Sequence, residues 1–403
     1  MKHLLTSTQS RRAVLKGAAA STALAFEGAF GAAIAQGADT IKIGALNVYT
    51  KGYGVFGEAA YKGMMLYLDE NKGMVAGRKV EILREDDEFN PQVGLQKLRK
   101  LVESDKVQVI MGPLGSHVAL AMVDYLRANG TPWICTGAGA TDLTKLRLPN
   151  FFRPTVSNWQ VAYAMGEWAA KNLAKDAAIV ASDFVTGHDI ANSFKESYLK
   201  GGGKIVKEIY PPITATDFSA YISDLRASAP GLTYCFFGGT DAARFVKQFD
   251  QFGLKGKSTL VGFQSVLDTD TFSGQGKSAV GGISSGIYSE LLDTPENKVF
   301  VERYRAKYKA MPGIFEETGY SALRCVDEAA KAVGGKIEDR PAFLAAMAKV
   351  SFVAPRGPLS FDPVTHQAIQ NIYIRRAKEE NNQIVNEVID VVRQMGDFPG
   401  NKA

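Results

Sequence analysis

The stretch Val109–Thr144, VIMGPLGSHVALAMVDYLRANGTPWICTGAGATDLT, decides the predicted fold. Its first residues form a β-branched apolar run that predicts a strand, and the breaker cluster GPLGS at 112–116 can open a helix. The apolar residues of that helix recur at helical spacing, at Val118, Met122 and Leu126. A second apolar run, TPWIC at 131–135, predicts the next strand. This order predicts one βα unit of a parallel sheet.

Both predicted strands end in small and hydroxyl-bearing residues. Ser116 follows the first strand, and TGAGATD at 136–142 follows the second. The carboxyl edge of an open α/β sheet is where ligands bind. Backbone N–H groups of such turns, together with the Ser116 hydroxyl, suit an anion such as a carboxylate. Two tight βα turns without a ligand would give the same pattern, and this stretch alone leaves both interpretations open.

The same alternation of strand and helix extends in both directions along the 403-residue chain, a length that favours about two domains. A third part adds helices and strands after two complete α/β series, which indicates that the chain returns to both domains. We predict an α/β fold of two doubly wound lobes, joined by a hinge with several crossings and separated by a ligand cleft. The predicted boundaries are 39–154 plus 288–361 for lobe 1 and 155–287 plus 362–395 for lobe 2.

Residues 1–35 have the features of an export signal. A basic start precedes an Ala-rich apolar segment, and Ala33-Ile34-Ala35 forms a small-residue cleavage site. Within this segment SRRAVLKG, residues 10–17, resembles the twin-arginine export motif. A basic amphipathic first helix is the alternative. The signal predicts a periplasmic protein whose signal peptide is cleaved near Ala35.

Composition excludes several classes of function. The chain has 47 basic and 42 acidic residues; residues 1–35 hold four and one of these, so 43 and 41 remain, a net charge of +2. This balance does not favour nucleic acid or an anionic membrane as partner. The four histidines lack metal-ligand spacing, so we predict neither a metal site nor a cofactor. Three distant cysteines, Cys135, Cys235 and Cys325, suggest buried free thiols, although the sequence leaves one disulfide open.

Motifs for catalysis are missing from the sequence. It contains no H-E-x-x-H and no P-loop. His117 and Ser116 are adjacent at a predicted helix start and point in different directions, which disfavours a base and nucleophile pair. The acids at 86–88 read as a solvated turn or as hinge and capping groups. We therefore predict a binding protein rather than an enzyme, with an exported α/β enzyme using His117 as the weaker alternative.

Motifs along the whole chain after residue 38 resemble type I periplasmic solute-binding proteins of the branched-chain amino acid (Leu/Ile/Val)-binding family, which serve ABC uptake transporters. The resemblance rests on these stretches: IKIGALNV, AAYKGMMLYLDE, DDEFNPQVGLQKLRKLV, MGPLGS, TGAGATDLT, DFSAYISDLRAS, LTYCFFGG, GFQS and GPLSFD. It implies a monomeric binding protein that delivers a small molecule to a membrane permease. A role as a ligand sensor for a membrane receptor remains open.

The resemblance also implies the binding residues. In that family the first lobe holds the ligand carboxylate, and the matching positions are Ser116, Ala138 and Gly139. An aromatic in the first loop matches Phe56. Second-lobe contacts match Thr186, Thr240 and Gln264. From their positions we add His117, Tyr53 and Trp159 as candidate ligand contacts. The relatives' disulfide matches Phe89 and Gly115, so that bond is lost here.

Two departures from the family bear on the ligand. The amino acid binders place an acid at the position of Gln264 to pair with the ligand's ammonium group, and a tyrosine at the position of Thr186. A neutral Gln264 loses a charge-assisted contact of about twice the strength of a neutral hydrogen bond. We therefore expect a small carboxylate with an aromatic body, such as a benzoate or phenylpropanoid. Branched-chain or other hydrophobic amino acids are the alternative ligands.

Overall fold

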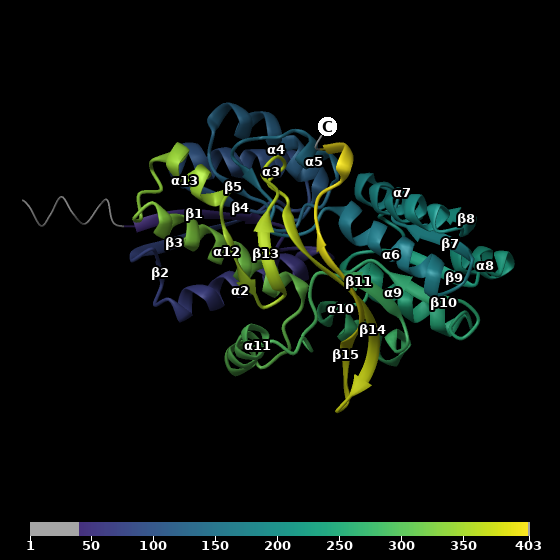
Figure 1. The fold of residues 1–403 in the computed structure, drawn as a ribbon. Coiled ribbons are helices and arrows are strands. Elements are labelled where there is room, and N and C mark those ends of the chain that lie inside the picture. The colour runs from purple at the N-terminus through teal and green to yellow at the C-terminus, as the bar shows by residue number, and fades with distance from the viewer. Residues whose placement is uncertain (1–39, 402–403) are drawn as a thin grey trace, which may run out of the picture.

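The computed structural model describes residues 40–401, and the predicted export signal lies outside the described residues. Two β-sheets organise the chain. Elements of the first sheet gather on one side of the molecule and those of the second on the other, while β13, β14 and β15 run between them (Figure 1). The fold is therefore the expected α/β arrangement of two lobes.

Lobe 1 is built on a six-stranded sheet in the order β2-β3-β1-β4-β5-β6, parallel except at β2. Its strands are β1 (Thr40–Asn47), β2 (Met74–Val75), β3 (Arg78–Asp86), β4 (Val109–Met111), β5 (Trp133–Ile134) and β6 (Phe151–Phe152). Its first helices are α2 (Gly54–Glu70), α3 (Pro91–Arg99), α4 (Ser116–Asn129) and α5 (Asp142–Lys145). The Asn90 side chain caps α3, and Pro91 is its first residue.

Lobe 2 contains the parallel strands β8-β7-β9-β10-β11 of the larger sheet. These are β7 (Asp176–Ala181), β8 (Lys204–Ile209), β9 (Leu232–Phe236), β10 (Thr259–Gly262) and β11 (Ile283–Gly286). The helices are α6 (Asn158–Asn172), α7 (Val185–Lys200), α8 (Ser219–Ser228), α9 (Gly239–Gln251) and α10 (Thr269–Gln275). One apolar cluster joins α6, α7 and α9 to these strands.

The last third of the chain connects the lobes. It comprises α11 (Pro295–Tyr308), α12 (Ile314–Ala332), α13 (Arg340–Met347), β12 (Ser351–Ala354), β13 (Gly357–Phe361), β14 (Ala368–Glu380) and β15 (Gln383–Met395). Helices α12 and α13 pack on lobe 1 with α2. Strand β14 pairs with β13 at one end and with β11 of lobe 2 further along. The residue boundaries predicted for the two lobes stay a prediction.

Polar side chains hold the crossings between the lobes together. Gln367 donates to the Thr155 carbonyl oxygen at 2.7 Å and to Gln160 Oε1 at 3.0 Å. Gln160 in turn donates to the carbonyl oxygens of Ala368 and Met395. These two amides therefore join the segments around residues 155–160, 367–368 and 395, and they satisfy the carbonyl oxygens of Thr155, Ala368 and Met395.

The structure differs from the sequence prediction in local details. Asp87 is buried and its Oδ1 accepts the Phe89 N–H, so of the two readings of the acids at 86–88 it fits a capping group and corrects that of a solvated turn. The three cysteines are buried and free, as predicted. Within residues 40–401 no helix combines the length and apolarity needed to span a membrane.

Candidate ligand site between the lobes

A cavity lies between the two lobes at the carboxyl ends of their strands. Its volume is about 60 Å³. One buried water needs roughly 10–15 Å³ on the same measure, so the cavity is several times larger than a water site. The lining residues are Tyr53, Phe56, Phe89, Leu114, Gly115, Ser116, Gly137, Gly139, Val156, Asn158, Phe184, Thr186, Phe236, Gly238, Phe263, Gln264, Ser265 and Phe315. The cavity therefore suits one small molecule enclosed by both lobes.

Aromatic rings form most of the wall. Seven of the lining residues are aromatic, and none of the lining side chains carries a charge. Tyr53 stacks on Phe89 with ring centroids 4.3 Å apart, and Phe56 stacks on Phe315 at 4.4 Å. These pairs bring together α2, the loop after β3 and the start of α12, so the wall is already assembled around an apolar, flat space.

The lobe 1 side of the cavity carries the polar groups expected for an anion. Ser116 Oγ accepts a hydrogen bond from the Ala140 N–H at 3.0 Å, so its own proton can be donated to a ligand. Helix α4 begins at Ser116 without a side-chain cap. Its first N–H groups therefore provide donors and a positive dipole end next to the cavity.

Small residues let the backbone approach the cavity. A Cβ atom on Gly139 would lie 2.1 Å from Asn158 Oδ1, and one on Gly137 would lie 2.7 Å from Leu114. The Asn158 N–H donates to the Gly139 carbonyl oxygen at 2.6 Å. The loop after β5 thus contacts the first residue of α6 directly, which only glycine at 139 permits.

Lobe 2 contributes neutral polar groups. Gln264 is 4% exposed. Its backbone carbonyl oxygen accepts a hydrogen bond from Arg375, while its side-chain Oε1 has no hydrogen-bond partner. Ser265 Oγ donates to the Phe237 carbonyl oxygen at 3.4 Å. Thr186, near the start of α7, is partly buried. An unpaired buried amide oxygen is costly, so this wall favours a ligand or water that re-orients the Gln264 amide.

Six of the ten residues predicted as ligand contacts line this cavity: Tyr53, Phe56, Ser116, Gly139, Thr186 and Gln264. Four lie elsewhere. His117 Nε2 lies 3.0 Å from the Phe89 carbonyl oxygen, and burial lowers the pKa of His117. Ala138 is fully buried in the apolar cluster between the sheet and α4. Whether any of the ten binds ligand stays a prediction.

The other two predicted contacts lie beside the cavity. Trp159 packs against Tyr163 at 4.7 Å and against Phe398 at 5.6 Å, so its ring faces the C-terminal segment. Thr240 follows Gly239 at the start of α9, where its Oγ1 would lie 3.0 Å from a Cβ on Gly52. Thr240 therefore lies where the lobes contact each other.

Sequence reasoning did not identify several aromatic walls of the cavity: Phe89, Phe184, Phe236, Phe263 and Phe315. Phe236 and Phe263 end or directly follow β9 and β10, inside the motifs LTYCFFGG and GFQS. Their position at the carboxyl ends of predicted strands would have marked them as residues lining a ligand cleft. Phe315 is brought in by α12 from a distant part of the chain, and no local pattern marks it.

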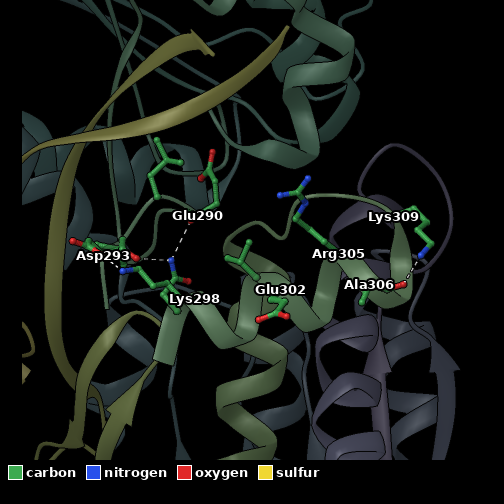
Figure 2. Close-up of a pocket in the computed structure, with 11 residues that line it drawn as sticks. Glu290, Asp293, Lys298, Glu302, Arg305, Ala306 and Lys309 are labelled. Atoms are coloured by element: carbon green, nitrogen blue, oxygen red, sulfur yellow. Dashed lines mark hydrogen bonds and ion pairs between the residues drawn. The ribbon is translucent and has the colours of Figure 1, made fainter. Parts of the chain in front are cut away.

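A larger hollow of about 890 Å³ lies along α11, outside the cleft. Figure 2 shows the side chains of Glu302, Arg305 and Lys309 spread along this helix, with Asp293 and Lys298 paired at its start. Its lining is mostly charged or aliphatic and includes no aromatic ring. None of the predicted contact residues lies there, so the smaller cavity between the lobes is the candidate ligand site.

Comparisons with known proteins agree with this geometry. A periplasmic binding protein family model matches residues 40–383. The Leu/Ile/Val-binding protein homolog 6 of Brucella melitensis is 28% identical over 378 residues, covering 92% of this chain and 96% of its own length. Family and structural neighbours are solute-binding proteins of ABC transporters.

Two solved structures show the same fold at higher identity. A solute-binding protein from Rhodopseudomonas palustris BisB5 in complex with 3,4-dihydroxybenzoic acid is 32% identical with a TM-score of 0.86, covering 90% of this chain and 99% of that one. Another from R. palustris in complex with benzoate is also 32% identical, with a TM-score of 0.82 and coverage of 88% and 98%. The chain therefore belongs to the periplasmic binding protein family, in its type I, branched-chain amino acid branch.

Proposed function

We propose that this protein captures a small aromatic carboxylate between its lobes and delivers it to the permease of an ABC uptake transporter. One observation carries the proposal: seven aromatic rings and no charged side chain line the cavity. A flat apolar ring gains burial and ring contacts in such a space. An α-ammonium group would enter it without any carboxylate to pair with.

The polar groups assign an orientation to the ligand. Its carboxylate lies at the start of α4, where the Ser116 hydroxyl and the first N–H groups of the helix can donate. Its ring lies between Tyr53 and Phe56 of lobe 1 and the rings of lobe 2. Gln264 contributes a neutral amide at the position where the amino acid binders of the family carry an acid.

Two relatives support the proposal by their ligands. The R. palustris proteins at 32% identity are described in complex with benzoate and with 3,4-dihydroxybenzoic acid. The second candidate, a binder of branched-chain or other hydrophobic amino acids, is favoured by the Brucella relatives named Leu/Ile/Val-binding protein homologs. That candidate requires a partner for the ammonium group, and the cavity lining has only neutral side chains and backbone carbonyl groups to offer.

We propose further that the protein acts as a monomer in the periplasm. The family provides the compartment and the association with an ABC transporter. Export by the twin-arginine route and cleavage near Ala35 follow from residues 1–35. The near-neutral charge of the remaining chain gives no basis for nucleic acid as a partner.

A thermal-shift screen of the chain from residue 36 tests the ligand class. The compounds are benzoate, 4-hydroxybenzoate, aliphatic carboxylates, leucine and valine. A ligand at about one hundred times its Kd adds roughly 2.7 kcal/mol to the free energy of unfolding, a readily measured shift. Stabilisation by the aromatic acids alone supports the proposal. Stabilisation by leucine and valine, with none by the aromatic acids, replaces it with the amino acid candidate.

A further inference from the structure

The lobes are joined by an ion–dipole contact outside the ligand cavity. Asp189 lies in the first turns of α7 in lobe 2, and its Oδ2 accepts two hydrogen bonds from Thr141 of lobe 1. The Thr141 N–H donates at 2.9 Å and the Thr141 hydroxyl at 3.1 Å. Asp189 does not line the cavity. The two bonds therefore join residues of different lobes.

The same carboxylate oxygen also positions a residue of the cavity wall. Asn158 Nδ2 donates to Asp189 Oδ2 at 2.8 Å. This bond orients the amide so that Asn158 Oδ1 faces the backbone of Gly139, where a Cβ atom would lie only 2.1 Å away. The Asn158 N–H is bonded to the Gly139 carbonyl oxygen. Asp189 is therefore linked to the predicted anion-binding loop through two residues, Thr141 and Asn158.

A second charged side chain holds this loop from its other side. The Arg153 guanidinium, fully buried, donates to the carbonyl oxygens of Ala138 and Ala140 at 3.2 and 2.8 Å. Residues 138–141 are thus fixed by Arg153 on the lobe 1 side and by Asp189 from lobe 2. Hydrogen bonds to a charged group are roughly twice as strong as those between neutral groups.

We propose that Asp189 is a closure latch: a positioning residue that stabilises the closed, ligand-holding form by clamping Thr141 across the cleft and orienting Asn158. The latch adds to the proposed function a determinant of ligand residence time that never touches the ligand. A group that binds only the closed form shifts the population toward it and slows ligand release.

The first test compares three variants by ligand release, with benzoate and leucine as probes in stopped-flow fluorescence. Asp189→Ala removes the latch, and Thr141→Val removes only the hydroxyl bond. Asp183→Ala is the matched control, because Asp183 is exposed and pairs with His188 of the same lobe. We expect about tenfold faster release for Asp189→Ala, about threefold for Thr141→Val and no change for the control. Equal release rates in Asp189→Ala and the control overturn the latch.

The second test does not depend on the ligand. Dyes on cysteines introduced at Lys349 of lobe 1 and Glu196 of lobe 2, both exposed, report the distance between the lobes by single-molecule energy transfer. The three native cysteines are buried, which leaves the introduced thiols as the labelling sites. Asp189→Ala and Thr141→Val should lower the closed population of the ligand-free protein, while Asp183→Ala should not.

These readouts separate the latch from the proposed function. If the wild-type protein binds neither benzoate nor leucine, the ligand assignment fails, and the closed population alone decides on the latch. An unchanged closed population in both Asp189→Ala and Thr141→Val overturns it. A lowered melting temperature of Asp189→Ala by itself marks a structural role; the milder Thr141→Val then decides, because it keeps the Thr141 N–H bond and the shape of the side chain.

Discussion

The ring edge of Tyr53 in lobe 1 packs against the backbone of Gly238 in lobe 2, at the wall of the cavity between the lobes. A Cβ atom on Gly238 would lie 2.1 Å from the Tyr53 ring. The ring cannot easily retreat, because it stacks on Phe89 at 4.3 Å. Closure of the lobes therefore depends on a hydrogen atom in place of a side chain at residue 238.

Gly238→Ala should hinder closure. The backbone at Gly238, φ −119° and ψ 152°, accepts alanine, so the effect comes from the contact with Tyr53. Overpacking of this kind costs about 1–3 kcal/mol, which predicts a rise of roughly tenfold or more in the Kd for benzoate, measured by calorimetry. The melting temperature of the ligand-free protein should stay within a few degrees, since opening relieves the contact. An unchanged Kd would show that the closed form tolerates the extra methyl group.

Ser116→Ala should weaken ligand binding and, to a smaller extent, the fold. The substitution removes a donor to the ligand carboxylate and leaves the buried Ala140 N–H without its acceptor. A hydrogen bond to a charged group predicts a loss of roughly tenfold to hundredfold in benzoate affinity, with about 1 kcal/mol lost from the free energy of unfolding. Calorimetry and urea unfolding check the two effects. Retention of full affinity would place the carboxylate elsewhere.

Gln264→Glu should exclude aromatic acids while leaving the fold intact. A glutamate carboxylate in this small enclosed cavity repels the carboxylate of the ligand, and the lining offers no cation to compensate. We expect the Kd for benzoate at about pH 8 to rise by more than tenfold relative to the neutral variant Gln264→Leu. If the glutamate variant gains leucine binding, residue 264 decides between amino acids and aromatic acids as ligands. Equal benzoate affinity in both variants would contradict the proposed position of the ligand.

The buried ion pair of the hinge should dominate stability. Arg356 Nε lies 2.6 Å from Glu317 Oε2, with both side chains fully buried, and Arg356 also donates to the Pro154 carbonyl oxygen. Glu317→Ala would leave an unpaired guanidinium in the interior, at a cost of about 3–5 kcal/mol in urea unfolding. Glu328→Ala on the same helix, with a side chain 40% exposed, is the control and should cost less than about 1 kcal/mol. Similar losses for both would show that water reaches the hinge.

Asp87 should make stability fall as pH rises through the acid range. The pKa of Asp87 is raised to about 6, mainly by burial. The hydrogen bond from the Phe89 N–H lowers this pKa, and the negative charge of Asp86 raises it. Between about pH 4 and pH 6 the native state binds more protons than the unfolded chain, so ionisation of Asp87 destabilises the fold.

Asp87→Asn keeps the acceptor for the Phe89 N–H, which Asp87 Oδ1 supplies at 2.8 Å, and removes the buried charge. The variant should gain on the order of 1–3 kcal/mol at about pH 8 and nothing at about pH 4. Asp124→Asn, whose side chain is 93% exposed, should show no such pH dependence. A constant difference at both pH values would indicate a packing effect instead.

The local pattern of the sequence predicted the frame of this protein. Short apolar runs and helical spacing of apolar residues, with breakers at 112–116 and 136–142, predicted parallel strands whose carboxyl ends meet, and the structure confirms the two-lobed α/β fold. The same reasoning predicted Ser116 and the turn at 136–142 on one side of a cavity, and Ser116 and two glycines of that turn line it; the family resemblance singled out Gly139. Resemblance to the family added Phe56, Thr186 and Gln264, which also line it.

Residue type and spacing could not predict contacts between distant segments. His117 and Trp159 carry the right chemistry, yet packing turns them toward Phe89 and Phe398 instead of the cavity. Phe315 joins the wall because α12 crosses back onto α2.

Sequence alone therefore determined the two sheets, the edge at which the cavity lies and the neutral Gln264, because apolar spacing and turn residues act over a few positions. Only the tertiary structure decided which rings line the cavity, that Asp87 is buried and that Asp189 contacts Thr141 across the cleft. These contacts join residues up to several hundred positions apart, and their geometry depends on how the two lobes pack together.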